Sequence, residues 1–244
     1  MISPTEDELS EEAEKTVPEK ATQISGIRIF LVRHGETHWN LTHRFQGRVD
    51  VPLNQEGKSQ ARALALTLKG EPLVAIYSSP LERTLETAEP IAKALNLQVT
   101  PLPGLLETDC GEWQGLSIRK LRRQKVWQPV TRNISLFKFP GGESMVDCQN
   151  RVVQTIESLR TSHAKSDLIA CFSHADPIKQ VIAFYLGMPL DHFQRLALSP
   201  ASVSALHIGE NGCQLLMLNF YPSFSWDAFQ PPKKARAERT TQPH

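Results

Sequence analysis

The sequence predicts an α/β fold of three layers, in which helices cover both faces of a mainly parallel sheet with an antiparallel edge strand. The first observation is that short apolar runs alternate along the chain with longer segments whose apolar residues recur at helical spacing. A parallel sheet built in this way is covered on both faces. The second observation is a pair of apolar runs around Gly209-Glu210-Asn211-Gly212, which is typical of a closing hairpin.

The strands and helices can be placed from these patterns. We expect strands at 27–32, 73–77, 97–100, 168–172, 203–208 and 213–218, and helices at 54–69, 81–95, 144–159 and 177–187. Gly70 and Gly187 stand where the first and last of these helices should end, and Pro177 lies where a helix start tolerates proline. Pro90 lies inside the second helix and is expected to kink it.

Length and composition indicate one domain with two tails. The chain has 244 residues, of which 40% are hydrophobic, enough for a substantial core. We place the domain at 26–221, between an acidic tail at 1–25 and a basic tail at 222–244, both expected to be disordered.

Charge and cysteine content exclude several functional classes. The net charge of +1 favours neither nucleic acid nor membrane as a partner, and no hydrophobic run reaches transmembrane length. The four cysteines are far apart and form no C-x-x-C pair, which argues against a zinc site or a disulfide framework. The chain start lacks the features of a secretory signal, so we expect a cytoplasmic protein, either a monomer or a homodimer.

Polar clusters follow three of the apolar strands. They are Arg33-His34-Gly35, Ser78-Ser79-Pro80 with Arg83 beyond it, and Ser173-His174. In an open α/β sheet the carboxyl ends of the strands form the ligand site, so parallel strands would bring these clusters together. Arginine's fork of donors matches phosphate oxygens, and the cluster therefore predicts a phosphoryl site.

These motifs resemble the histidine phosphatase superfamily, which has the phosphoglycerate mutase-like fold. The resemblance starts at Leu31-Val32-Arg33-His34-Gly35-Glu36-Thr37 with Trp39-Asn40 and covers about 27–218 in the family's order. It continues at Arg44-Phe45-Gln46-Gly47, Pro52-Leu53-Asn54-Gln55-Glu56-Gly57, Ser78-Ser79-Pro80-Leu81-Glu82-Arg83-Thr84, Glu107 with Gly111, Trp113 and Gly115, Pro140-Gly141-Gly142-Glu143-Ser144, and Phe172-Ser173-His174.

The resemblance implies roles for six residues. His34 would attack phosphorus to give a phosphohistidine that water then hydrolyses, with its tautomer held by a backbone carbonyl near Gly35. Glu107 would be the general acid that protonates the leaving oxygen and later activates water. The phosphate oxygens would be bound by Arg33, Asn40, Arg83 and His174, with His174 also counted as catalytic. Arginine and histidine then supply the positive charge, so no metal or other cofactor is expected.

The resemblance favours a phosphatase over a mutase. The family's cofactor-dependent mutases carry Tyr three positions after the catalytic Glu and Asn two positions after the second His. Here those positions hold Cys110 and Asp176, and Asp176 would repel an acidic phosphoglycerate unless it is paired. The expected activity is therefore hydrolysis of a small phosphorylated metabolite. The alternatives are a cofactor-dependent phosphoglycerate mutase and a non-catalytic phosphoryl-binding module.

Substrate choice is expected from the segment 116–142, which would lie over the site. Its basic residues could receive a second anionic group or form a solvated helix face: Arg119, Lys120, Arg122, Arg123 and Lys125. Trp127 and Phe137 could wall the pocket or pack beneath it, whereas Trp113 is expected to pack. His34, His38 and His43 are not expected to hold a metal, because Trp39 and Asn40 lie between them in an expected loop.

Overall fold

The computed structural model of the chain describes residues 25–128, 130 and 133–222. The two tails predicted from the sequence lie outside these residues, except for Ser25 and Pro222. Across the described part of the chain, the helices are too short or too polar to cross a membrane.

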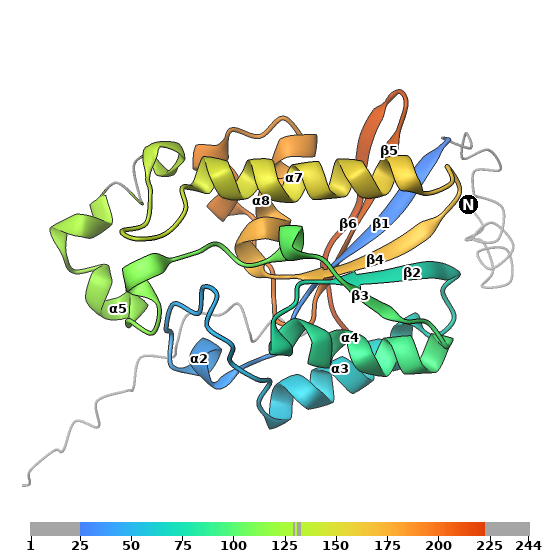
Figure 1. The fold of residues 1–244 in the computed structure, drawn as a ribbon, viewed down its shortest axis with the longest axis horizontal. Coiled ribbons are helices and arrows are strands. Elements are labelled where there is room, and N and C mark those ends of the chain that lie inside the picture. Colours follow the sequence, from blue (N-terminus) through green and yellow to red (C-terminus); the bar gives the residue numbers. More distant parts are fainter. Residues whose placement is uncertain (1–24, 129, 131–132, 223–244) are drawn as a thin grey trace, which may run out of the picture.

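A six-stranded sheet forms the centre of the fold, in the order β3-β2-β4-β1-β5-β6 (Figure 1). The strands are β1 (Gly26–Arg33), β2 (Leu73–Ser78), β3 (Val99–Pro101), β4 (Leu168–Ser173), β5 (Val203–Gly209) and β6 (Gly212–Phe220). The pairs β1–β4, β2–β4 and β2–β3 are parallel, and β5 runs antiparallel to β1 and β6. The predicted mainly parallel sheet with an antiparallel edge is confirmed.

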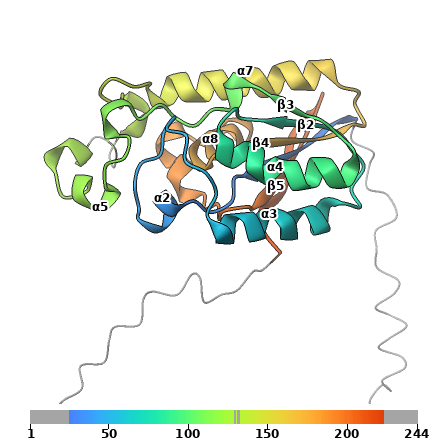
Figure 2. The same cartoon turned by 60° about the horizontal axis from the view of Figure 1, so that its bottom comes forward.

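Helices lie on both faces of this sheet (Figure 2). One layer holds α3 (Gln55–Leu68) and α4 (Glu82–Leu95), and the other holds α7 (Met145–Ser162) and α8 (Ala175–Tyr185). The shorter elements are α2 (His38–Leu41), α5 (Ile118–Leu121), η1 (Pro103–Leu105), η2 (Gly111–Trp113), η3 (Lys125–Trp127), η4 (Ile134–Leu136) and η5 (Leu190–Arg195). The three-layer prediction is therefore confirmed as well.

Apolar side chains fill the space on each side of the sheet. One core joins β1, β4 and β5 to α7 and α8 through side chains such as Ile29, Ile156 and Ile182. The other joins the opposite face to α3 and α4 through side chains such as Leu64 and Ile91. All six residues of β4 are buried, as expected for a central strand covered on both faces.

Local sequence explains the helix boundaries. Asn54 caps α3, because its side chain accepts a hydrogen bond from the Gly57 backbone N–H at 2.8 Å. Helix α8 begins at Ala175, two residues before its predicted start, so Pro177 lies in the first turn, where its missing N–H costs nothing. The buried face of α4 differs from the predicted apolar one because it includes Arg83, Thr84 and Thr87.

The topology brings the three polar strand ends together. Strands β2, β4 and β1 are neighbours and run in the same direction, with Arg33 opposite Ser173 and Ser78 opposite Phe172. Their carboxyl ends therefore meet at one edge of the sheet. In Figure 1, α2 and the segment around α5 lie beyond this edge, at the left.

Candidate active site

His34 lies directly after β1 and is 2% exposed. Its Nδ1 atom lies 2.7 Å from the carbonyl oxygen of Gly35. A carbonyl can only accept, so Nδ1 carries the proton and the lone pair of the neutral ring is on Nε2. Burial, together with the charges of Arg83 and Arg33, holds the pKa of His34 well below 6.5. The site therefore holds His34 as a neutral imidazole with one available nitrogen.

His174, at the end of β4, is fully buried beside His34. The two ring centroids are 5.3 Å apart. The Nδ1 atom of His174 accepts a hydrogen bond from Arg83 Nε at 3.2 Å, and its Nε2 lies 2.9 Å from Ser79 Oγ. Burial and the neighbouring positive charges also lower the pKa of His174 well below 6.5. The second histidine is therefore held in place through residues that follow β2.

Arg83 is completely buried at the start of α4. Besides His174, it donates to the carbonyl oxygens of Val49 and Gly47, at 2.9 and 2.8 Å. Burial lowers the pKa of Arg83 to about 10, so the guanidinium remains charged at neutral pH. These bonds use three of its five N–H groups, which leaves donors for a ligand.

Arg33 is the last residue of β1, and its charge helps to lower the pKa of both His34 and His174. Its Nη1 donates to the carbonyl of Leu198 at 2.5 Å. Its Nε is buried and has no hydrogen-bond partner among the described residues. A buried, unpaired charged donor is costly, and an anion bound beside it would satisfy it. The structure thus places two guanidinium groups around the imidazole of His34.

Asn40 lies in the capping box of α2. Its Oδ1 accepts from the Thr37 backbone N–H and from Thr37 Oγ1, at 2.9 and 3.0 Å. This use of the oxygen fixes the side chain and leaves its amide NH₂ as the group that can donate to a ligand. The structure therefore gives Asn40 a structural task in addition to the predicted contact with phosphate.

Glu107 lies in the loop after η1. Its Oε1 accepts from the Thr108 backbone N–H at 2.9 Å. Burial and the negative charge of Asp176 raise the pKa of Glu107 to about 7, against the opposing effects of that hydrogen bond and of the site's arginines. A carboxyl group with this pKa can both donate and accept a proton near neutrality, as general acid–base catalysis needs.

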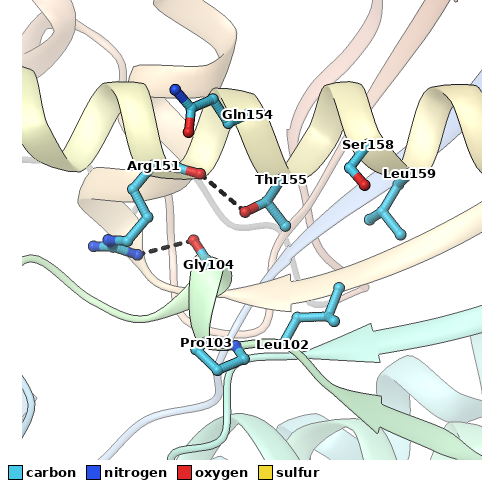
Figure 3. A pocket seen from close by; sticks show the side chains of 8 residues that line it. All are labelled: Leu102, Pro103, Gly104, Arg151, Gln154, Thr155, Ser158 and Leu159. Carbon is cyan, nitrogen blue, oxygen red and sulfur yellow. Dashed lines mark hydrogen bonds between the residues drawn. The ribbon is translucent and has the colours of Figure 1, made fainter.

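A pair of charged residues braces the loop around Glu107. Arg151 on α7 donates to the carbonyls of Gly104 and Leu106 at 2.8 and 3.0 Å, and Figure 3 shows the first of these bonds. Arg151 also binds Glu143 at 2.7 Å, and Glu143 accepts from the Asp109 backbone N–H at 2.9 Å. The backbone is thus held on both sides of Glu107.

Close backbone packing requires glycine at two positions beside His34. A Cβ atom on Gly35 would lie 2.7 Å from the carbonyl oxygen of Gly57, and one on Gly57 would lie 2.1 Å from the carbonyl oxygen of Glu36. The φ of Gly35 is not positive, so a left-handed backbone is not what requires glycine there. The reason for glycine is the contact between this loop and the start of α3.

The segment 116–142 places aromatic rather than basic side chains on its inner side. Phe137 of this segment is buried, and Trp127 is half-buried against Trp113, which precedes the segment. Trp113 is itself buried, which confirms the expected packing. Four of the five predicted basic residues are exposed and line no cavity near the site: Arg119, Lys120, Arg123 and Lys125. For these four, a solvated surface is the interpretation that fits. Only Arg122 lines a cavity beside the site.

The sequence did not indicate the roles of two residues of the site, Thr87 and Ser79. Thr87 accepts from the Gly35 backbone N–H at 2.9 Å and donates to the Arg83 carbonyl at 2.6 Å, so it links α4 to the His34 loop. Its position four residues after Arg83 was the available signal, because polar residues at this spacing share a helix face. Ser79 was visible in the motif after β2, but nothing indicated its contact with His174.

The histidines near the end of β1 differ in exposure. His34 is buried, whereas His38 is exposed on α2. Among the residues that the structure describes, no group of three or more His, Cys, Asp or Glu side chains could hold a metal ion.

Comparisons with known proteins show the family of this chain. The sequence profile of the histidine phosphatase superfamily (branch 1) matches residues 29–220. The chain is 35% identical over 198 residues to "Phosphoserine phosphatase 1" of Hydrogenobacter thermophilus, covering 79% of this chain and 92% of that protein. It is also 35% identical over 182 residues to a "Probable phosphoglycerate mutase GpmB" of Proteus mirabilis, covering 73% of this chain and 83% of that protein.

Solved structures show the same likeness. A mycobacterial glucosyl-3-phosphoglycerate phosphatase superposes with a TM-score of 0.71 at 27% identity, covering 79% of this chain and 98% of that one. A phosphoserine phosphatase from Entamoeba histolytica, in complex with 3-phosphoglyceric acid, superposes with a TM-score of 0.72 at 27% identity, covering 80% and 98%.

Proposed function

Because the chain belongs to the histidine phosphatase superfamily, we propose that it is a metal-independent phosphomonoester hydrolase that forms a phosphohistidine on His34. Its substrate would be a small phosphorylated metabolite. One observation carries this proposal: His34 is a buried neutral imidazole, fixed through Nδ1 and flanked by two guanidinium groups. A nucleophile needs the free lone pair, and the phosphate needs the positive charge.

The first step transfers the phosphoryl group to the protein. His34 Nε2 donates its lone pair to phosphorus, the bond from phosphorus to the ester oxygen breaks, and that oxygen takes the proton of Glu107. Arg33, Arg83, Asn40 and His174 stabilise the charge on the other phosphate oxygens. The guanidinium groups supply the positive charge that a metal ion supplies in other phosphoryl-transfer sites, which is why the proposal needs no metal.

The second step releases phosphate. Glu107, now a carboxylate, takes a proton from water while the water oxygen attacks phosphorus. The bond from phosphorus to Nε2 breaks and its electron pair returns to the ring. The sum of both steps is ester plus water to alcohol plus phosphate. The pKa of Glu107, raised to about 7, suits both of its tasks.

The surroundings of Asp176 favour hydrolysis over the mutase alternative. Its carboxylate accepts from Gln194 Nε2 at 3.0 Å, and no ion pair to it forms among the described residues. Its charge acts on both Glu107 and Arg33, raising the pKa of each. A phosphoglycerate carboxylate in that place would be repelled.

The experiment that tests this function measures phosphate release from p-nitrophenyl phosphate and a panel of phosphomonoesters in the presence of EDTA. Wild type and His38→Ala should release phosphate, since His38 is exposed on α2, and His34→Ala should not. Rapid quenching into base should trap an acid-labile phosphoprotein from wild type only. Activity retained in folded His34→Ala, or lost with EDTA, contradicts the proposal.

The mutase and binding-module alternatives predict other results in the same assays. A mutase primed with a bisphosphoglycerate would interconvert phosphoglycerates faster than it releases phosphate. A binding module would retain phosphate esters without forming the phosphoprotein.

A further inference from the structure

A cavity of about 740 Å³ lies beside the candidate active site. Its wall is formed by the segment around α5, by α7, and by α8 with η5. The apolar lining residues are Phe45, Ile118, Trp127, Val130, Ile134, Phe139 and Met145, and the polar ones are Arg122, Asp176, Asp191 and Gln194. This volume is in the range of cavities that hold ligands of drug size, and it far exceeds a three-carbon group.

The cavity adjoins the leaving-group side of the site. Asp176 lines it and lies two residues after His174, in the first turn of α8. The same carboxylate is close enough to Glu107 to raise its pKa. Since Glu107 would protonate the leaving oxygen, the alcohol part of a bound phosphate ester must extend into this cavity.

The wall of the cavity is largely aromatic, and other aromatic rings pack against it. Trp127 stacks on Trp113, with ring centroids 5.9 Å apart and planes at 15°. Phe45 lies 6.1 Å from the Trp127 ring and 5.9 Å from Phe139. Phe137 packs beneath, 4.9 Å from Phe139. A rigid aromatic wall of this kind favours an apolar ring, because it buries area without ordering flexible side chains.

The charged residues of the cavity disfavour a second anionic group. Two carboxylates line it, and Asp191 is fixed by hydrogen bonds from the backbone N–H and Oγ of Ser135, at 2.8 and 3.0 Å. The single cation among the described lining residues, Arg122, lies over the Trp127 ring, 5.6 Å from its centroid. A carboxylate next to the ester would therefore meet Asp176 first.

From this cavity we infer, on the basis of the proposed function, that the preferred substrates are phosphomonoesters of bulky, ring-bearing alcohols that carry no carboxylate or second phosphoryl group near the ester. The aromatic wall binds the ring, and the arginines bind only the transferred phosphate. Small acidic esters such as phosphoserine and phosphoglycerate fill little of the cavity and approach Asp176.

The test compares esters of primary alcohols, so that leaving-group reactivity stays similar. The series is ethyl, 2-phenylethyl and 2-(naphthyl)ethyl phosphate, with phosphoserine and 3-phosphoglycerate. We expect kcat/KM to rise at least about tenfold from the ethyl to the naphthylethyl ester, as hydrophobic pockets discriminate by this order. The two carboxylated esters should be the poorest substrates.

Variants assign the preference to the cavity. Trp127→Ala should raise KM for the naphthylethyl ester while kcat/KM for ethyl phosphate changes less than about twofold. The matched control is Leu136→Ala, because Leu136 is 82% exposed in the same segment and does not line the cavity. Asp176→Asn should raise the activity ratio of 3-phosphoglycerate to phenylethyl phosphate.

The outcomes separate this inference from the proposed function. If the protein hydrolyses the esters but prefers the carboxylated ones, the inference is overturned and the proposed function stands. The same holds if the aromatic ring brings no gain in kcat/KM. If no ester is hydrolysed, the function fails, and calorimetry with phosphonate analogues still tests the cavity. Tighter binding of 2-(naphthyl)ethylphosphonate than of ethylphosphonate, reduced in Trp127→Ala, would uphold the ligand class, and equal binding would overturn it.

Discussion

The Nδ1 atom of His34 lies 2.7 Å from the carbonyl oxygen of Gly35, in the residue that follows it. This contact fixes the tautomer and the orientation of the ring with a group that no side-chain substitution can remove. Any change in the nucleophile's reactivity must therefore come from its charge environment or from a shift of the loop.

The pH dependence of kcat/KM should be bell-shaped. His34 must be neutral, and its pKa is held well below 6.5, so activity rises with pH through that low value. Glu107 must be protonated, and its pKa is raised to about 7, so activity falls as pH rises through about 7. Asp176→Asn removes a charge that raises the Glu107 pKa, so the alkaline limb should move to lower pH, whereas Asp191→Asn should leave it in place. An alkaline limb that does not respond to Asp176→Asn contradicts this assignment.

Glu107→Gln should impair hydrolysis according to the leaving group. The amide cannot donate a proton as the ester bond breaks, so kcat for alkyl phosphates should fall by about 10²–10⁴. The loss should be smaller for p-nitrophenyl phosphate, whose leaving group needs no proton. Single-turnover kinetics on both ester types measure the difference. An equal loss for both would indicate that Glu107 positions the substrate rather than protonating it.

Arg83→Lys should weaken both phosphate binding and folding. A lysine ammonium cannot reach Gly47, Val49 and His174 together, as the guanidinium does. Each buried acceptor left unpaired costs about 1–3 kcal/mol, so the free energy of unfolding should fall by about 2 kcal/mol or more. Urea unfolding and the inhibition constant for inorganic phosphate measure the two effects. Arg119→Lys on exposed α5 serves as the control and should change neither.

Gly57→Ala should disturb the His34 loop from a distance. Its Cβ would lie 2.1 Å from the carbonyl oxygen of Glu36, and that backbone must shift. We expect a loss of about 1–3 kcal/mol in the free energy of unfolding, the usual cost of overpacking, together with lower kcat. Gly70→Ala is the matched control, since no atom lies within 4 Å of its added Cβ. Thermal unfolding with activity assays distinguishes them, and equal stability of the two variants would contradict the close-packing argument.

Most of the fold could be predicted from the pattern of apolar strands in the sequence. The runs that end at Arg33, Ser78 and Ser173 were readable because apolar strands stop abruptly at polar residues. Parallel pairing then brings those ends to one edge without further information. Gly70 and Gly187 marked the ends of two helices, since a helix end depends on the few residues around it.

What the sequence left open depends on contacts between distant residues. The motif after the second strand assigns Arg83 to the phosphate site, but its bonds to the carbonyl oxygens of Gly47 and Val49, which hold the buried guanidinium, cannot be recognised from the local sequence. The cavity wall joins Phe45, Trp127 and Gln194 from separate parts of the chain. For the basic cluster after position 116 the sequence leaves anion binding and a solvated surface open. Arg119, Lys120, Arg123 and Lys125 are exposed, whereas Phe137 and Phe139 of the same segment are buried.

The pairing of β1 also determines when the protein can become active. Its two neighbours are β4 and β5, with Arg28 opposite Leu168 and Gly26 opposite Gly209. During synthesis β1 stays unpaired until β4 and β5 have left the ribosome, which happens only after most of the chain is made. Contacts so distant in sequence slow folding, and the waiting apolar strand is exposed to aggregation. A chain released before β4 would carry His34 and Arg83 but no assembled site.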